Sequence, residues 1–211
     1  MRRALSKRHP RLVGVDDGAF ARGDRTAPVA AVVVSAPERV ESIRLTRVRV
    51  NGRDGTERII RLLRLLDDRV GIRAVLLDGP VVGGFNVLDL DAIRTAVGVP
   101  VIAVTRRRPD AARIRAALER WFPRTAEARL ALLRQHRLFR VRTGGLPIWA
   151  AASGCTAADA VHLLHRATAR GYWPEPLRLA HLIASAVRSA PQRTDRTIKG
   201  RRRSRPVGPV A

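Results

Sequence analysis

AVLLDGPVVGGFNVLDL (residues 74–90) decides the fold prediction, because an apolar run, a carboxylate and closely spaced glycines follow one another within it. The segment 72–78 is typical of a buried strand, and Asp78 stands at its end. A surface turn would explain Asp78, since Asp-Gly pairs commonly form turns after strands. A metal site would explain it too, so the choice depends on the rest of the chain.

The surrounding segments predict three consecutive strands and then alternating helices and strands. An apolar run ends in Asp16-Asp17-Gly18, a continuous apolar run covers 29–34, and apolar residues alternate over 43–50. The expected order continues with a helix at 55–70, the strand at 72–78, a helix at 87–97, a strand at 99–105 and a helix at 109–122. Beyond these we expect helices at 125–137, 156–171 and 174–189, and short strands at 138–142 and 146–152.

Several helix ends carry capping signals. Thr56 and Asn86 are plausible N-caps, and Gly98 closes the helix 87–97. Pro109 is expected in the first turn of its helix, and Pro174 and Pro176 open the last one.

This order predicts an α/β fold with a mixed sheet of about five core strands, three antiparallel and then parallel, with flanking helices. RNase H-like nucleases use the same order of elements. A dinucleotide-binding fold is disfavoured because no GxGxxG follows the first strand, and a P-loop is disfavoured because residues 79–84 lack the GK[ST] ending.

The charge is strongly unbalanced: 41 Lys and Arg face 18 Asp and Glu in 211 residues, for a net charge of +23. Lys7 and Lys199 are the only lysines, so arginine supplies nearly all of the excess. Such a chain suits a polyanionic partner, because the guanidinium group binds phosphate in a bidentate fork. An arginine-biased genome would raise the arginine content without any ligand, and we expect both causes to contribute.

Cysteine content and hydropathy indicate the compartment. The single Cys155 excludes an internal disulfide and a cysteine-based zinc site, and it fits a reducing cytoplasm. No run approaches the ~20 apolar residues of a membrane span. We therefore expect a soluble cytoplasmic protein without membrane contact, of an oligomeric state that the sequence does not indicate.

The chain divides into a basic leader (1–10), a single domain (11–190) and a basic tail (191–211). The tail lacks apolar periodicity, so we predict that it is disordered. Arg201, Arg202 and Arg203 in the tail are candidates for phosphate contacts, although a tail that only aids solubility is nearly as good an explanation.

In the predicted order, the first and fourth strands lie side by side and parallel, so Asp16 and Asp78 converge at the carboxyl edge of the sheet. Two close carboxylates repel each other unless a cation lies between them, and Mg²⁺ or Mn²⁺ prefers such oxygen ligands. A metal there supports phosphodiester hydrolysis. Gly79, Gly83 and Gly84 would let a phosphate backbone come close to the chain.

Five segments together resemble the mostly archaeal endonuclease dU family, a relative of endonuclease V. They are VGVDDGAF, VNGRDGTERI, VLLDGPVVGGFNVLDL, GVPVIAVTRRRPD and PEPLRLAHLIASA, and the likeness runs from about 13 to 186. It implies an RNase H-like, endonuclease V-like fold and cleavage of DNA or RNA near deaminated bases with Mg²⁺ or Mn²⁺. It also implies that Asp16 and Asp78 hold the metal and that Arg106 stands near a lysine of endonuclease V.

The resemblance changes how His181 is interpreted. By pattern alone, this histidine beside Leu182 and Ile183 is a partly buried core residue. By resemblance it lies at the metal site, where it adjusts the metal-bound water or assists proton transfer.

The chain also departs from endonuclease V. Residues 49–52 stand where that enzyme carries a duplex-opening wedge, and they lack its aromatic residue and proline. The third carboxylate is Asp54 or Glu57, of which we prefer Asp54, although Asn51 replaces a family aspartate nearby. Asp17 is a further ligand or supports the ligands from behind.

The sequence thus predicts a metal-dependent endonuclease that cuts DNA, with RNA left open, next to deaminated bases such as uracil or hypoxanthine, in a repair role. A non-catalytic nucleic-acid-binding module with a vestigial or regulatory metal site is the main alternative. Hydrolysis of a small phosphorylated molecule is a third possibility.

Overall fold

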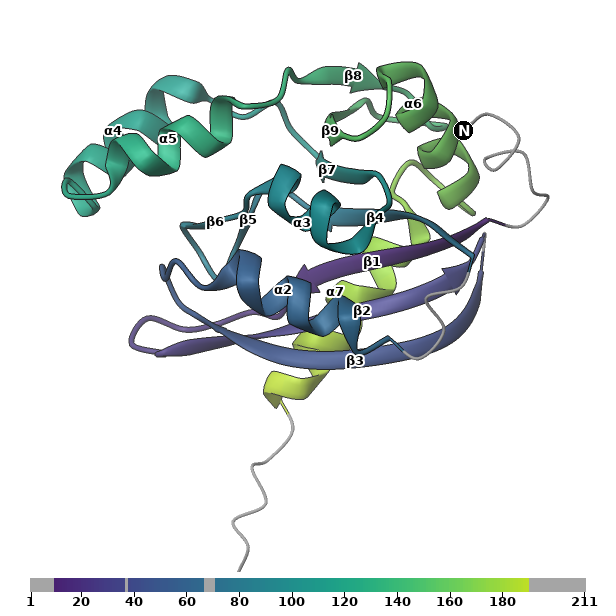
Figure 1. Cartoon of the computed structure of the whole chain (residues 1–211), viewed down its shortest axis with the longest axis horizontal. Helices are drawn as coiled ribbons and strands as arrows, with labels where there is room; N and C mark the ends of the chain where they lie inside the picture. Colours follow the sequence, from purple (N-terminus) through teal and green to yellow (C-terminus); the bar gives the residue numbers. More distant parts are fainter. Residues whose placement is uncertain (1–9, 37, 67–70, 190–211) are drawn as a thin grey trace, which may run out of the picture.

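The computed structural model describes residues 10–36, 38–66 and 71–189 (Figure 1). The predicted tail and all of the predicted leader except its last residue lie outside the described residues. The strands are β1 (Arg11–Asp17), β2 (Thr26–Ser35), β3 (Arg39–Arg49), β4 (Ile72–Asp78), β5 (Val81–Val82), β6 (Asn86–Val87), β7 (Val101–Thr105), β8 (Phe139–Val141) and β9 (Ile148–Ser153). The helices are α2 (Gly55–Arg64), α3 (Leu90–Val97), α4 (Ala111–Trp121), α5 (Ala126–Arg134), α6 (Ala157–Ala167) and α7 (Glu175–Ser189).

One seven-stranded sheet, in the order β3-β2-β1-β4-β7-β9-β8, organises the molecule. Strands β1 to β3 form an antiparallel meander, and β4 and β7 continue the sheet in parallel with β1. The predicted mixed α/β fold is confirmed, as is the parallel pairing of the first and fourth strands. The sheet exceeds the expected five core strands because β9 pairs antiparallel with β7 and β8 pairs with β9.

Helices cover both faces of this sheet (Figure 1). On one face, α2 and α3 bury Ile59, Leu62 and Ile93 against the apolar side chains of the central strands. On the other face lie α6 and α7, which contribute Leu163 and Leu177 to a second core cluster. The central strands β1, β2, β4 and β7 read as continuous apolar runs because both of their faces are buried, whereas the edge strand β3 alternates and is largely exposed.

Gly14 of β1 and Gly18, which directly follows that strand, let α7 lie directly against the sheet. A Cβ at Gly14 would stand 2.1 Å from the carbonyl oxygen of Pro176, and one at Gly18 would stand 2.3 Å from that of Ala184. Contacts this short are impossible for any side chain, so both positions require glycine. Since α7 carries His181, this close crossing also brings the histidine to the end of β1.

The helix ends differ from the predictions in three places. Asp89, rather than Asn86, caps α3 through its side chain, because Asn86 belongs to β6 and turns its amide toward Asp54. Thr56 lies inside the first turn of α2, and its hydroxyl instead accepts a hydrogen bond from the backbone N–H of Asp89.

At α4, Asp110 is the N-cap, so Pro109 precedes the helix instead of lying in its first turn. The predicted C-terminal glycine of α3 is confirmed, because Gly98 adopts a left-handed conformation with φ 74°.

Helices α4 and α5 project from the sheet as an arm, at the left of Figure 1. Leu118, Ala126 and Leu130 form a small core of their own between the two helices. The buried Arg129 of α5 anchors the arm, because its guanidinium donates to the backbone carbonyls of Asn51 and Phe85.

No helix in the described part of the chain is long and apolar enough to cross a membrane.

Candidate active site

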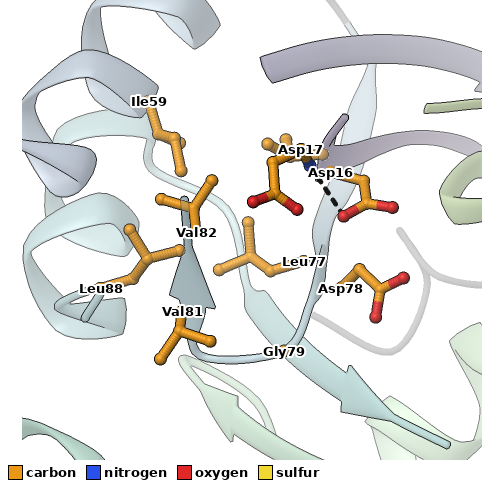
Figure 2. Close-up of a pocket in the computed structure, with 10 residues that line it drawn as sticks. Asp16, Asp17, Ile59, Leu77, Asp78, Gly79, Val81, Val82 and Leu88 are labelled. Atoms are coloured by element: carbon orange, nitrogen blue, oxygen red, sulfur yellow. Dashed lines mark hydrogen bonds between the residues drawn. The ribbon is translucent and has the colours of Figure 1, made fainter. Parts of the chain in front are cut away.

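The candidate site lies at the carboxyl edge of the sheet, where β1 and β4 end side by side. Val15 pairs with Leu77 across these parallel strands, so Asp16 and Asp78, the next residue on each strand, stand next to each other. Figure 2 shows the two carboxylates beside one another, with Asp17 turned toward Val82. The predicted convergence of Asp16 and Asp78 is therefore present in the structure.

Hydrogen bonds fix each of the three carboxylates. Asp16 is 6% exposed, and its Oδ1 accepts from the backbone N–H of Asp17 at 2.7 Å. The Oδ2 atom of Asp17 accepts from the backbone N–H of Gly83 at 2.6 Å. Asp78 Oδ2 lies 3.4 Å from Nη1 of Arg106.

His181 reaches this cluster from the opposite end of the chain. Its Nδ1 lies 2.9 Å from Oδ2 of Asp16, while half of its side chain, 52%, remains exposed. The ring therefore connects a buried carboxylate to solvent. His181 therefore lies beside Asp16 and not within the core, and the role that the resemblance implied stays a prediction.

Burial dominates the electrostatics of the three aspartates. Burial first, and then the charges of Asp78 and Asp17 and a side-chain hydrogen bond with Asp78, together raise the pKa of Asp16 to about 9. Burial also raises the pKa of Asp17 and that of Asp78, and the positive charge of Arg106 opposes the rise at Asp78. Three carboxyl groups that resist ionisation together form an environment that a cation would relieve.

The residues at this edge fit a hard divalent cation in a limited way. They line a small cavity of about 10 Å³, which is close to the space that one water-sized body needs. Within the described residues, no group of three or more His, Cys, Asp or Glu side chains is arranged to hold a metal ion. Asp16 and Asp78 would thus supply two ligands, and Mg²⁺ commonly completes its shell with water and substrate phosphate.

The other predicted ligands lie elsewhere. The Asp54 carboxylate accepts from the backbone N–H of Arg49 at 3.2 Å and from the side-chain amide of Asn86 at 2.8 Å. Glu57 is exposed on α2, where it pairs with Arg61. The structure therefore does not gather Asp16, Asp54 and Asp78 into one cluster, and the third carboxylate at the cavity is Asp17.

Glycines on both sides of β5 border the site: Gly79 precedes this strand, and the loop with Gly83 and Gly84 follows it. Gly79, Gly83 and Gly84 all have positive φ, and a Cβ at Gly84 would stand 2.4 Å from Oδ1 of Asn51. Asn51, with φ 56°, accepts from the backbone N–H of Phe85 at 2.9 Å. These contacts join the loop to the β3–α2 turn. This turn stands where endonuclease V carries its wedge, and it lacks the aromatic residue and the proline of that wedge.

Two further residues shape this region: Asn86, which was predicted only as a helix cap, and Arg129, for which no role was predicted. Asn86 is fully buried and bridges Asp54 to the backbone N–H of Gly55 at 2.9 Å. Arg129 lies on the buried face of α5 with Ala126 and Leu130. An arginine within the apolar pattern of a predicted helix was the sequence signal that could have indicated a buried role. The predicted tail residues Arg201, Arg202 and Arg203 lie outside the described residues.

Comparison with known proteins identifies the relatives of this chain. It matches the model of the endonuclease dU family over residues 8–188. The UPF0215 protein of Methanothermobacter thermautotrophicus is 35% identical over 178 residues, covering 84% of this chain and 87% of the relative. The UPF0215 protein of Thermococcus gammatolerans is 35% identical over 184 residues, covering 84% and 91%.

Solved structures share the fold. A protein of unknown function from Archaeoglobus fulgidus superposes with a TM-score of 0.75 at 30% identity, covering 84% of this chain and 98% of that chain. Endonuclease V of Ciona intestinalis, bound to DNA that contains an inosine followed by a ribo-adenosine, gives a TM-score of 0.58 at 15% identity, covering 86% and 87%. The likeness to endonuclease V, which is RNase H-like, confirms the predicted fold class.

Proposed function

Because this chain belongs to the endonuclease dU family, we propose that it is a metal-dependent endonuclease that hydrolyses phosphodiester bonds in nucleic acid. We propose DNA as the preferred substrate over RNA, cleavage next to deaminated bases such as uracil or hypoxanthine, and a role in repair in the cytoplasm. The observation that carries the proposal is the contact between Asp16 and Asp78, two carboxyl groups that end adjacent strands and both resist ionisation.

In this proposal Asp16 and Asp78 hold Mg²⁺ or Mn²⁺ at the carboxyl edge of the sheet. When bound, the metal would activate water and stabilise the leaving oxygen of a phosphodiester. Asp17 supports the site from behind, because its carboxylate is already engaged by the backbone N–H of Gly83 at 2.6 Å.

His181 would move the proton. Its ring contacts Asp16 through Nδ1 on one side and is half exposed, so it can exchange a proton with water or with a substrate oxygen. The Asp16 carboxylate fixes the orientation of the ring, as second partners commonly do for catalytic histidines.

Arg106 would bind the phosphate beside the metal. Its guanidinium lies 3.4 Å from Asp78 and stacks on the ring of Trp173 at 3.9 Å, so it is held at the site before any substrate arrives. A planar guanidinium retained in this way can bind two phosphate oxygens at once.

Two features support a nucleic-acid partner. The net charge of +23 favours a polyanion. Endonuclease V of Ciona intestinalis, which shares the fold, was solved with DNA that contains an inosine. The β3–α2 turn lacks the aromatic residue and the proline of a wedge, so we propose that base opening of that type is not used here.

A second candidate function is a nucleic-acid-binding module with a vestigial or regulatory metal site. The absence of a third clustered metal ligand among the described residues favours it. It predicts salt-sensitive binding of nucleic acid that does not depend on Asp78.

The test is cleavage of labelled DNA and RNA oligonucleotides, with and without a central uracil or inosine, in Mg²⁺ or Mn²⁺. Asp78→Ala should abolish cleavage and retain binding, while Glu119→Gln, which removes an exposed carboxylate of α4, should leave both unchanged. Cuts at a fixed distance from the modified base would identify the lesion. Absence of cleavage by the wild type in every combination, with binding intact, would refute the enzyme and leave the binding module.

A further inference from the structure

A row of residues continues from the candidate site across the remaining strands of the sheet. Asp78 of β4 pairs with Val104 of β7, and the next residue of β7, Thr105, pairs with Trp149 of β9. Trp149 in turn pairs with Arg140 of β8. Adjacent residues of a strand point to opposite faces, so Thr105, Trp149 and Arg140 point to the face opposite to Val104 and Asp78. The row therefore passes around the carboxyl edge of the sheet, from a candidate catalytic carboxylate to an arginine on its last strand.

Arginines on this row are held against tryptophan rings. The guanidinium carbon of Arg106 lies 3.9 Å from the ring centroid of Trp173, and that of Arg108 lies 5.3 Å from the ring of Trp149. Arg140 shares a face with Trp149, because directly paired residues of neighbouring strands point to the same side of a sheet. Stacking fixes the plane of a guanidinium and leaves its N–H edge available for an anion.

The local charge on this edge is strongly positive. Segments 105–110 and 137–142 contain six arginines, all exposed, and one acid, Asp110. The carboxylate of Asp110 is already used, because it caps α4 and pairs with Arg113. A hollow of about 460 Å³ beside the last two strands is lined by Arg137, Arg140 and Trp149, among others. A surface of this kind suits a chain of phosphates better than a single small anion.

We propose that Arg106, Arg108, Arg140 and Trp149, which we call the arginine row, bind the phosphate backbone of the substrate strand on one side of the cleaved bond. The inference rests on the proposed function, since it takes Asp78 as the cutting point. It adds a binding subsite and a direction, because the bound strand runs from β4 across β7 and β9 to β8.

The sheet geometry sets the length of this subsite. Asp78 and Arg140 lie three strand spacings apart, which is about 14 Å at ~4.8 Å per spacing. Phosphates of one DNA strand follow one another at about 3.4 Å along the helix axis. Because successive phosphates are farther apart along the strand itself than along the helix axis, the arginine row spans at most about four nucleotides from the cleaved bond.

The arm supplies a matched control. Arg120 lies 5.0 Å from the ring of Trp121, also as an exposed arginine stacked on tryptophan, but at the end of α4 and off the row. If arginine simply raises affinity wherever it stands, Arg120→Gln will weaken binding as much as Arg108→Gln. If the row is a subsite, only substitutions within it will do so.

Binding is measured with the full chain carrying Asp78→Asn, so that no substrate is cut, using fluorescein-labelled oligonucleotides at several salt concentrations. The double variant Arg108→Gln and Arg140→Gln should weaken binding about tenfold at moderate salt. It should also lower the slope of log Kd against log salt by about 1.5, since each lost phosphate contact removes about 0.7–0.9. Arg120→Gln should change the slope much less than Arg108→Gln or Arg140→Gln, because it alters only the long-range charge and removes no phosphate contact.

Length dependence supplies the second readout. Shortening the oligonucleotide from six to two nucleotides on one side of the modified base should weaken binding by the parent chain but not by the double variant, because the lost phosphates are those the row contacts. Three outcomes would each overturn the proposal. The salt slope of the double variant could be unchanged, Arg120→Gln could weaken binding as much as the row substitutions, or the length dependence could survive the double substitution.

The two proposals fail separately. Cleavage by the otherwise unaltered chain is scored on the same oligonucleotides. If the chain with Asp78 intact shows no cleavage while the row variants lose affinity as described, the arginine row stands and the nuclease proposal falls. If cleavage occurs and the row variants bind normally, the nuclease stands and the row falls.

Discussion

Replacing Asp16 by asparagine should stabilise the metal-free protein at neutral pH. Asp16 is buried, and its neighbours Asp17 and Asp78 are acidic as well. Asparagine keeps the side-chain oxygen that accepts from the backbone N–H of Asp17 at 2.7 Å, while it removes the ionisable carboxyl group. The substitution therefore changes the electrostatics of the site more than its packing.

The size of the effect follows from the pKa of Asp16, which is about 9 in the folded protein against a usual 3.8. Between these pH values the folded chain holds a proton that the unfolded chain has released. Wild-type stability therefore falls as the pH rises from about 4 to about 9, by at most ~1.4 kcal/mol per pH unit. The limit at pH 7 is about 4 kcal/mol, and we expect Asp16→Asn to recover roughly half of it because Asp17 and Asp78 remain and still repel each other.

The measurement is urea unfolding in EDTA at pH 4, 5.5 and 7, followed by circular dichroism. Asp16→Asn should match the wild type within ~0.5 kcal/mol at pH 4 and exceed it by about 2 kcal/mol at pH 7. Glu119→Gln controls for loss of an exposed carboxylate and should show no such divergence. The difference in unfolding free energy between Asp16→Asn and wild type should grow with pH. If it does not, the conclusion that the site disfavours the ionised form of Asp16 is refuted.

Three further outcomes are expected. Mn²⁺ at a hundred times its Kd should stabilise the wild type by about 2.7 kcal/mol, which raises the Tm by roughly 5–10 °C in calorimetry. Removal of the metal by EDTA should reverse this rise, and Asp78→Asn should show no metal-dependent rise in Tm. Gly14→Ala should lower the free energy of unfolding by more than about 3 kcal/mol or prevent folding, because the new Cβ would stand 2.1 Å from the Pro176 carbonyl oxygen. Gly23→Ala is the control: it has open space around it and should cost only about 1 kcal/mol for its positive φ. Thermal melting of the two variants tests whether α7 depends on the contact at Gly14. Arg129→Met should destabilise the protein by about 2 kcal/mol, since it leaves the carbonyls of Asn51 and Phe85 without their donor. Amide hydrogen exchange should become faster in the arm before it does so in the central strands. An equal increase in exchange rate across the whole chain would contradict this.

The sequence was sufficient to predict how the central strands pair. The apolar runs of β1 and β4 and the helix between them leave few ways to form a sheet, so the adjacency of Asp16 and Asp78 could be predicted from pattern alone. The position of His181 at Asp16 could not, since 165 residues separate them and only the resemblance pointed there.

The misplaced helix starts have a common physical cause. Asn86, Asp89 and Asp91 are all acceptable caps within six residues, and the register of β6 decides which one faces the helix end. At α2, the N-cap position falls to Asp54, whose carboxylate is instead occupied by contacts with Arg49 and Asn86. Such choices depend on tertiary contacts that no local pattern contains.

The partners of Arg129 and Trp173 could not be predicted for a different reason. Arg129 binds backbone carbonyls, which carry no sequence signature, and the Arg106–Trp173 contact joins a loop after β7 to the start of α7. A residue type alone cannot indicate a partner of that kind.

The close crossing of α7 over β1 at Gly14 and Gly18 has a consequence for biosynthesis. The carboxylates of the candidate site are synthesised early, at 16, 17 and 78, whereas α7 follows all seven strands of the sheet. A partly translated chain therefore carries the proposed metal ligands without the histidine and without the helix that covers β1. Under the proposed function, we expect such a nascent chain to be inactive as a nuclease until the last helix has docked.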